Sequence, residues 1–542
     1  MPIYRAEQAR LSFAGEAGPG GYIENASADD EGGGGSTVLA SNTVAGAKSL
    51  VVSSATSFAV GDYIRIEAAG ASAREIRKIV EISGTTFYLD APLGFRHLAG
   101  VTVVEMDTAS NLAGNSFITF LPGVYTSITT PDPENEFLPQ YFLSTTGSRN
   151  FTRMYRGQQS FNGSLSSLIL LNGFPLRFPI GKVATVGTDS GAGGSTLSSA
   201  TAVGVREIDI AAGTGYADGD FIQIDTGNNS EVRQIISGGG TTTLVLNYPL
   251  LIAHASGVAC NEVAAPFTHT IVETSELGSM SWHLQMRDSG EAAANDLLRR
   301  YFGGKVNRGT LSADEGGLLM FSWDDIQFLD LIHNQTAHSA VTGEILRSSS
   351  AMIAPAGIGG SIPEDSSALG TPTFPTTDPY YYSQGVLTFF GQELARIRDF
   401  RLEINNNIET RRYINTLGAG RRGPTEIQEQ RREYRLSATL ALPDSLAADA
   451  STRTLWKELI LEGNYDAGLA GFDMSLAFTR GASDSITITL PSASASDGFE
   501  TQGGFIVRAP HAITEESPVQ AEVEILVRNL SIVIVDSIGV YP

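Results

Sequence analysis

The residues best suited to ionic chemistry are arginines gathered in one stretch of the chain. Residues 396 to 435 contain ten Arg and six acidic residues, whereas the whole chain has 36 basic and 59 acidic residues and a formal net charge of -23. A guanidinium presents a flat, forked set of donors that binds carboxylates or phosphates through paired hydrogen bonds. This stretch therefore predicts a contact site rather than a site of bond-making chemistry.

The strands that position these arginines can be read from the alternation of apolar and polar residues. Phe400, Leu402 and Ile404 alternate with charged residues, which predicts facing strands over 396–407 and 430–442, each with one side buried. The connection between them is about 20 residues long, far beyond the two to five residues of an ordinary hairpin loop. We expect such a loop to make contacts outside its own domain.

Three interpretations of this loop are open. It is a solvated loop, or it contacts nucleic acid with Arg pairs beside Tyr413 and Tyr434, or it reaches another copy of the same acidic protein. The acidic residues interspersed with the arginines, among them Glu409 and Glu433, suit a specific protein contact better than a uniform phosphate track. The acidic remainder of the chain also disfavours nucleic-acid binding. We therefore favour self-assembly.

Motifs for catalysis are missing from the sequence. It contains no Gly-x-Ser-x-Gly, no P-loop, no His-Glu-x-x-His and no Cys-x-x-Cys pattern. A glycan-cleaving pair of carboxylates remains an alternative because acids are plentiful, but no candidate pair stands out. We expect no enzyme, no catalytic residue, no metal and no cofactor.

Composition favours a mainly β protein of two to four domains. The chain has 542 residues, 42% of them hydrophobic, with 59 Gly and many short Val, Ile and Leu stretches. Its one cysteine, Cys260, lies in an apolar run and is expected to be buried and unreactive. No stretch is apolar enough to span a membrane, and the start lacks the apolar core of a signal peptide. We expect assembly in the cytoplasm. Proteins that work in high salt also carry a strong negative charge, which suggests a halophilic host.

Two segments of the sequence resemble each other and predict a repeated β module. Gly61-Asp62 aligns with Gly219-Asp220, and His97 aligns with His254. Each unit reads as short strands broken by Gly-Asp and Gly-Thr turns. The two histidines could bind a metal, but one His per module without ligand partners at the usual spacing more often satisfies a turn.

Outside the modules, the sequence twice shows a strand, a polar turn, a helix and a further strand. The expected helices are Ser289 to Phe302 and Asp449 to Leu461. We infer two tandem β domains, each with a flanking helix. The predicted organisation is 1–35, 108–187 and 265–347 for the first domain, 36–107 for module A, 188–264 for module B, 348–379 for a linker and 380–542 for the second domain.

These residues are similar in order and character to the tail tube proteins, or major tail proteins, of long non-contractile-tailed viruses, the siphovirus type. The similarity covers most of the chain outside the modules. It is carried by ARLSFAGEAGPGG, FLPGVYTSITTPDP, RNFTRMYRGQQSFNGSLSSLILLNGFPLRFPIGKV, HTIVETSELGSMSWHLQMRD, YFGGKVNRGTLS and VLTFFGQELARIRDFRLEINNNIETRR.

The resemblance implies β-sandwich or β-barrel tube domains whose sheets join into rings. Family members with a duplicated domain form trimeric, pseudo-hexameric rings that stack into a hollow tube for DNA ejection. A long hairpin from each domain would contact the next ring. For the second domain we assign the contact loop to Arg411, Arg412, Tyr413, Arg421, Arg422, Arg431 and Arg432. For the first domain we assign it to Arg149, Arg153 and Arg156.

The resemblance also implies partners. These are other copies of the chain, a tape-measure protein, and tail-tip and terminator proteins, with viral DNA passing through an acidic lumen without specific binding. The two modules would be solvent-facing or bind host glycans. The alternative is another component of the virion tail, such as a tail-tip protein or an adhesin decorated with β modules.

Overall fold

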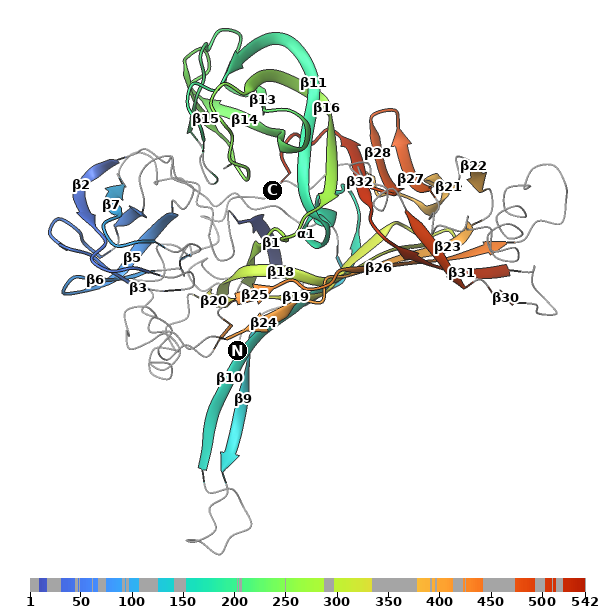
Figure 1. Cartoon of the computed structure of the whole chain (residues 1–542), viewed down its shortest axis with the longest axis horizontal. Helices are drawn as coiled ribbons and strands as arrows, with labels where there is room; N and C mark the ends of the chain where they lie inside the picture. The colour runs from blue at the N-terminus through green and yellow to red at the C-terminus, as the bar shows by residue number, and fades with distance from the viewer. Residues whose placement is uncertain are drawn as a thin grey trace, which may run out of the picture.

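The computed structural model confirms that the chain is built mainly of β-strands (Figure 1). Helical turns in the part that it describes are limited to α1 (Arg177–Ile180) and short 3-10 segments. The structure describes residues 9–16, 31–43, 47, 49–60, 62–66, 75–89, 93, 97–106, 125–140, 153–201, 203, 207–248, 250–286, 297–333, 378–389, 392–394, 397–412, 423–424, 426–441, 473–492, 503–508, 510–512 and 520–541.

The largest sheet, sheet 1, has 13 strands and runs through both halves of the chain. Its main path is β29-β31-β26-β23-β18-β19-β10-β8. The path strands are β8 (Ser127–Thr129), β10 (Arg153–Ile169), β18 (Leu297–Asp314), β19 (Met320–Gln327), β23 (Ile397–Asn405), β26 (Glu433–Ala441), β29 (Gly504–Arg508) and β31 (Gln520–Val527). Strands off the path are β1 (Ala9–Gly15), β9 (Pro133–Gln140), β17 (Met280–Met286), β20 (Asp330–His333) and β30 (His511–Ala512).

Sheet 1 repeats one arrangement of four strands. In space the order is β8, β10, β19, β18 and then β23, β26, β31, β29, and the two sets follow each other along the chain in matching order. The sets meet where β18 pairs antiparallel with β23, with Leu311 opposite Leu402. The predicted pairing of 396–407 with 430–442 is confirmed, because β23 pairs with β26 along its length.

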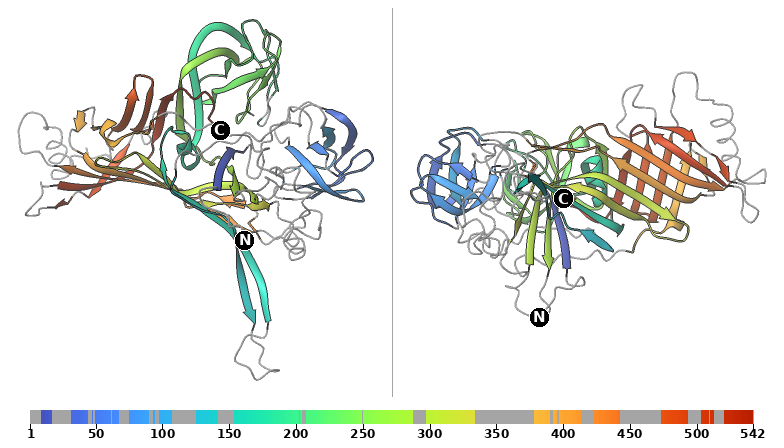
Figure 2. Two further views of the ribbon diagram at one scale, coloured as in Figure 1. Left: turned by 180° about the vertical axis from the view of Figure 1, so that it is seen from behind. Right: turned by 90° about the horizontal axis from the view of Figure 1, so that it is seen from below.

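A second sheet of 11 strands, sheet 2, lies over one face of sheet 1 (Figure 2). Its path is β12-β15-β14-β13-β16-β32-β28-β27-β21-β22, with β11 on β16. The strands are β11 (Gly181–Thr196), β12 (Glu207–Asp209), β13 (Phe221–Ile224), β14 (Glu231–Ser237), β15 (Thr243–Leu246), β16 (Ala259–Glu273), β21 (Gly385–Phe389), β22 (Gln392–Leu394), β27 (Met474–Gly481), β28 (Asp484–Leu490) and β32 (Ser531–Asp536).

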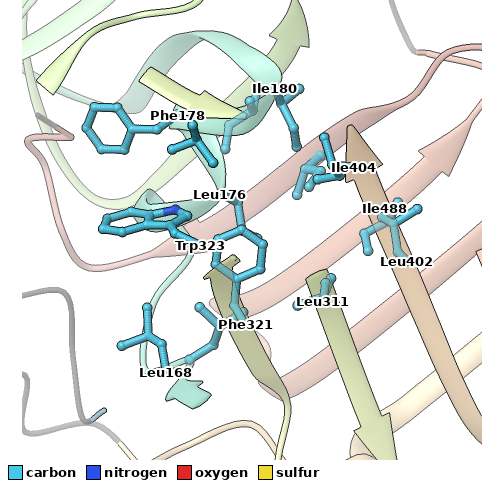
Figure 3. Close-up of a cluster of buried hydrophobic side chains, with 14 of the residues drawn as sticks. Leu168, Leu176, Phe178, Ile180, Leu311, Phe321, Trp323, Leu402, Ile404 and Ile488 are labelled. Carbon is cyan, nitrogen blue, oxygen red and sulfur yellow. The ribbon is translucent and has the colours of Figure 1, made fainter. Parts of the chain in front are cut away.

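The main hydrophobic core lies between these two sheets (Figure 3). It forms because each strand of sheet 1 turns alternate side chains toward sheet 2: Phe400, Leu402 and Ile404 are buried, whereas Arg401 and Glu403 between them are exposed. Aromatic rings fill its centre, as where Phe13 meets Trp323 edge to face at 5.4 Å. The opposite face of sheet 1 carries polar and charged side chains.

The expected helix at residues 289–302 is wrong for its second half. Residues 297–302 are the start of β18, which pairs with β17 on one side and β20 on the other. Tyr301 and Phe302 are fully buried there. Two-sided strand pairing and aromatic burial thus outweigh the local helix preference. Residues 289–296 and the expected helix at 449–461 lie outside the described residues.

The sequence repeat corresponds to two small sets of strands with equivalent turns. One is sheet 3, with path β2-β7-β4-β5-β6-β3; the other is built from β12 to β15 with parts of β11 and β16. In each, the turn Asp accepts a 2.6 Å hydrogen bond from a backbone N–H three residues earlier, at Asp62 and at Asp220. The sheet 3 strands are β2 (Glu31–Val38), β3 (Ser49–Val51), β4 (Tyr63–Ile66), β5 (Glu75–Ser83), β6 (Thr86–Leu89) and β7 (Thr102–Met106).

The two modules differ in their attachment. Module B continues directly from a long two-stranded ribbon, because β11 pairs with β16 from Gly181 opposite Glu273 to Thr196 opposite Ala259. In sheet 3 the two ends of the strand path meet after β2 and β3, where Leu39 forms a bridge with Val52. The exact domain limits remain predictions, and the linker 348–379 lies outside the described residues except for its last two.

His254 and Cys260 sit inside module B. The ring nitrogens of His254 contact two carboxylates, Nδ1 to Asp225 at 3.3 Å and Nε2 to Glu231 at 3.1 Å. The fold therefore brings to His254 the acidic neighbours that its local sequence lacks. Cys260 is buried, as the sequence predicts.

Candidate assembly interface

A long hairpin, arm 1, projects from sheet 1 into solvent (Figure 1). It consists of β9 and the first half of β10, paired from Arg153 opposite Gln140 to Phe161 opposite Pro133. Every residue of β9 after Pro133 is exposed. A two-stranded hairpin exposed on both faces buries too little surface to be stable by itself, so we expect it to dock against a partner.

Arm 1 carries an apolar patch near its outer end. Phe137, Leu138, Met154 and Tyr155 are 43% to 52% exposed. Successive side chains of a strand point to opposite faces, so the paired Tyr155 and Leu138 lie on one face of the ribbon and Met154 and Phe137 lie on the other. Apolar side chains exposed on both faces near the end of a hairpin are typical of a protein contact surface, and we call these four residues the apolar patch of arm 1.

The base of arm 1 is fixed to the rest of sheet 1 by one acidic residue. Asp132 accepts hydrogen bonds of 2.5 Å from Arg299 and of 3.0 Å from the Tyr301 hydroxyl. A second contact, 2.7 Å from Gln159 Nε2 to Asn135 Oδ1, links the two strands. These bonds set the direction in which the arm leaves the sheet.

The arginine loop has a structured base, which we call arm 2. It is the ribbon of β24 (Glu409–Arg411) and β25 (Glu426–Gln428). Ile408, directly before β24, and Ile427, in the middle of β25, pack with Leu277 and Leu329 in a small apolar cluster. Arm 2 therefore packs against residues from the first part of the same chain.

Polar contacts reinforce this packing. Glu429 accepts a 2.7 Å bond from Lys305 and a 2.9 Å bond from the Leu277 N–H. Asn406 donates through its side chain to Val306 O and Pro179 O, at 2.9 and 3.0 Å. These buried bonds fix the point at which the loop leaves β23.

The predicted contact arginines divide into several groups. Arg432 donates to Asn406 Oδ1 at 2.9 Å and to Thr274 O at 3.1 Å. Arg412 donates to Gln159 O at 2.6 Å, and burial lowers its pKa, against the opposing charge of Glu136. Arg411 pairs with Glu409 at 3.1 Å. Arg412 therefore brings arm 2 against the base of arm 1.

The other predicted contact residues are exposed or outside the described residues. Arg431 is exposed, and so is Arg153 on arm 1. Arg156 lies opposite Phe137 in the arm 1 register. Tyr413, Arg421, Arg422 and Arg149 lie outside the described residues.

The uncovered face of sheet 1 is a mosaic of paired charges. Arg435 bonds to Glu433 at 2.7 Å and to Glu524 at 3.0 Å, and Arg401 bonds to Glu403 at 2.7 Å. These carboxylates raise the pKa of Arg435. Each of these arginines is therefore neutralised by acids on its own or a neighbouring strand.

The apolar patch of arm 1 is a feature that sequence reasoning missed. Its residues come from PENEFLPQ and RMYR, in which apolar residues do not alternate regularly with polar ones. A strand exposed on both faces has no buried side to impose a period of two. The usable signal was the presence of large apolar residues in an otherwise acidic segment.

Within the described residues, no group of three or more His, Cys, Asp or Glu residues could hold a metal ion. The described helices also include none that is long and apolar enough to cross a membrane.

Comparison with known families decides the class of this protein. A family model described as phage tail tube protein matches residues 144–526, well over half of the chain. The chain belongs to the phage tail tube protein family. A comparison with curated protein sequences found no match.

The matched residues of this tail tube protein include most of the elements described above. The match spans β10 of arm 1, arm 2, module B, and most strands of both large sheets. Sheet 3, at residues 31–106, lies outside it. The protein is therefore a structural component of a viral tail, and the exposed arms and sheet ends are its candidate contact surfaces.

Proposed function

We propose that this protein assembles into stacked rings that form the tail tube through which viral DNA is delivered. The observation that carries the proposal is the repeated four-strand set of sheet 1. Its two ends, β8 and β29, are separate edges, whereas the corresponding strands inside the chain, β23 and β18, are paired to each other. Sheet edges are prone to pair with other strands.

The ring follows from repeating this internal junction between chains. If β29 of one copy lies beside β8 of the next, each contact reproduces the β18–β23 pairing. Such a head-to-tail contact closes into a ring when the rotation allows it. Three copies give six strand sets, which supports the trimeric, pseudo-hexameric ring that the resemblance implies.

The lumen is assigned to the uncovered face of sheet 1. Sheet 2 covers the other face, so closing the ring leaves this mosaic facing inward. Arginines held by carboxylates, such as Arg435 between Glu433 and Glu524, have little free charge for phosphates. DNA would then slide past without adhering.

The stacking contacts are assigned to the two arms. Arm 1 offers an apolar patch to the next ring, together with Arg149, Arg153 and Arg156. Arm 2 would offer the loop that it supports, with Tyr413, Arg421, Arg422 and Arg431. Arg412 and Arg432 act by fixing the base of arm 2, because their hydrogen bonds are made within the chain.

The same proposal assigns positions to the two modules and to the other tail proteins. Modules A and B would project outward, facing solvent or binding host glycans, and the tube would meet tape-measure, tip and terminator proteins. Assembly would occur in the host cytoplasm. The second candidate function is a tail-tip protein or an adhesin. Copy number in the virion separates the two candidates, because a tube subunit would be among the most abundant virion proteins and a tip protein among the rarest.

Electron microscopy of the purified chain tests the proposal. Concentrated protein, tried across salt conditions that include high salt, is expected to form rings or tubes with three-fold symmetry. Deleting residues 410–428 should leave soluble rings that do not stack. Tubes of normal length from the deletion variant would reject the role of arm 2, and monomers under all conditions would reject the tube.

A further inference from the structure

A cavity of about 430 Å³ lies where module B meets the two large sheets, and its lining holds three cationic and three acidic side chains. Its walls come from the end of β1, from α1 and the start of β11, from module B loops, and from the segment after β16. Lys182 and Lys305, two of the five lysines in the chain, line it together with Arg177. A volume of this size is in the range of small-molecule sites.

Arg177 is the unusual member of this lining. It is 7% exposed, and its Nε and Nη1 atoms are buried with no hydrogen-bond partner among the described residues. Burial lowers its pKa to about 10, although Tyr248 and Glu231 act in the opposite direction. Two buried guanidinium N–H groups without an acceptor are costly, because they have lost their water and gained no hydrogen bond in exchange.

Of the three acids in the lining, Glu276 is exposed, and Glu231 and Glu16 are engaged by hydrogen bonds. Glu231 binds Arg233 at 2.5 Å and accepts the Leu251 and Ile252 N–H groups, both at 2.9 Å. Glu16 accepts the Gly303 N–H at 3.0 Å. These bonds leave no carboxylate oxygen of the described residues within hydrogen-bond distance of Arg177 Nε or Nη1.

Two further donors face the same space. Lys182 Nζ is 2.6 Å from the neutral Asn229 Oδ1, and burial lowers the pKa of this lysine. Ser279 lines the cavity with a buried Oγ that has no partner among the described residues. Gly278 stands beside Arg177; a Cβ there would lie 3.6 Å from Nη2, so the glycine keeps the approach to the guanidinium wide.

We propose that this cavity binds a small oxyanion, a phosphate or carboxylate compound, held by Arg177, Lys182 and Ser279. Its lining joins module B to the tube sheets, so a bound anion would fix the module at its root. The site needs only the folded chain and does not depend on ring formation or stacking.

The test is anion binding to the purified full-length protein. Phosphate, sulfate and citrate are titrated at constant ionic strength, with sodium chloride as the reference, by calorimetry and by thermal unfolding. At least one of the three is expected to bind and to raise the unfolding temperature beyond the general effect of the salt. Arg177→Met should weaken binding about 10- to 100-fold, the factor that one or more charge-assisted hydrogen bonds contribute.

Matched variants separate a site from a general charge effect. Gly278→Ala keeps every charge and adds one methyl beside the guanidinium, so it should also weaken binding. Arg308→Met removes an exposed arginine of sheet 1 and should bind anions as the wild type does. Binding of phosphate and sulfate as well as citrate indicates a general oxyanion site, whereas binding of citrate alone indicates an organic polycarboxylate.

Two outcomes would overturn the proposal. One is equal stabilisation of wild type and Arg177→Met by all three anions, which is the general effect of excluded salts. The other is no binding to the wild type at millimolar concentration. Without anion, Arg177→Met is expected to unfold at the same temperature as the wild type or higher, since it removes buried N–H groups that lack an acceptor; a clear loss of stability would show a purely structural arginine.

Discussion

Leu311 in β18 lies directly opposite Leu402 in β23, and both side chains are buried beneath sheet 2. This pair joins the two strand sets of sheet 1 within one chain. The ends of the sheet, β8 and β29, occupy the corresponding positions but have one strand neighbour each on the sheet path. The β18–β23 pairing within one chain is thus the same kind of contact that we propose between β29 of one chain and β8 of the next.

A charge on the β29 edge should prevent ring formation without unfolding the protein. Val507 is 60% exposed in β29. We expect Val507→Lys to give a folded, soluble monomer, because a lysine on a sheet edge opposes pairing with another strand. Light scattering and negative-stain microscopy measure the outcome. Ile236→Lys, at a 47% exposed position in module B, is the control and should assemble normally; normal rings from Val507→Lys would contradict the edge assignment.

Polar substitutions in the arm 1 patch should block stacking selectively. Phe137→Ser combined with Tyr155→Ser removes two rings that are 52% and 47% exposed. The unfolding midpoint should change little because these side chains are not in the core. Tubes should be lost, and rings should remain visible by microscopy. The matched change Leu98→Ser, 55% exposed in module A, should leave tubes intact, and long tubes from the double variant would argue against arm 1.

Asp484→Asn should destabilise the contact between the early and late parts of the chain. Arg480 binds Asp484 at 2.7 Å, donates to Leu171 O at 3.0 Å and lies 3.9 Å over the ring of Tyr380. Removing the partner of a buried charge costs about 3–5 kcal/mol, and the partial exposure of Asp484 favours the lower end. Urea unfolding measures the loss of unfolding free energy. The control Asp324→Asn, at an exposed site, should lower the unfolding free energy by less. Equal stability of the two variants would show that the Arg480–Asp484 pair contributes nothing.

The thiol of Cys260 should be unreactive in the native protein. Burial raises its pKa to about 12, with a further contribution from Asp225. The reactive thiolate is therefore scarce at pH 8, and access is blocked as well. Mass spectrometry after iodoacetamide treatment should show no adduct before unfolding and one adduct afterwards. Rapid modification of the folded chain would mean that module B opens readily.

Glu231 should stabilise module B in a pH-dependent way. Burial alone would raise its pKa, but Arg233 and His254 together with backbone bonds bring it below its ordinary value. A lowered folded-state pKa gives stability that is present above the unfolded-state value and lost as pH falls through the folded-state value. Glu231→Gln should therefore reduce stability at pH 7, and the difference from wild type should shrink below about pH 4. A difference that is constant with pH would contradict this account.

The sequence predicted features that depend on local patterns. The β23–β26 pairing follows from alternation around Phe400, and the repeated modules follow from matching turns at Asp62 and Asp220. The helix expected at 289–302 was wrong for residues 297–302, because the burial of Tyr301 and Phe302 between two neighbouring strands is a tertiary effect.

The candidate site was harder to foresee for the same reason. The arginine loop was correctly located, but its sequence does not show that Arg432 is held by Asn406 and Thr274. The pairing of β16 with β32 joins residues more than 250 positions apart. Contacts of that range depend on the closed fold, which no local period encodes.

The ribbon of β11 and β16 has a practical consequence. It carries a complete folded unit at one end and is anchored in sheet 2 at the other, with Gly181 opposite Glu273 at the anchored end. A foreign domain can be inserted at the outer end of this ribbon if its own two chain ends lie as close together as the two strands do. If the chain forms tubes as proposed, replacing module B with an unrelated small domain, such as a binding protein or an enzyme, would give a filament displaying regularly spaced cargo.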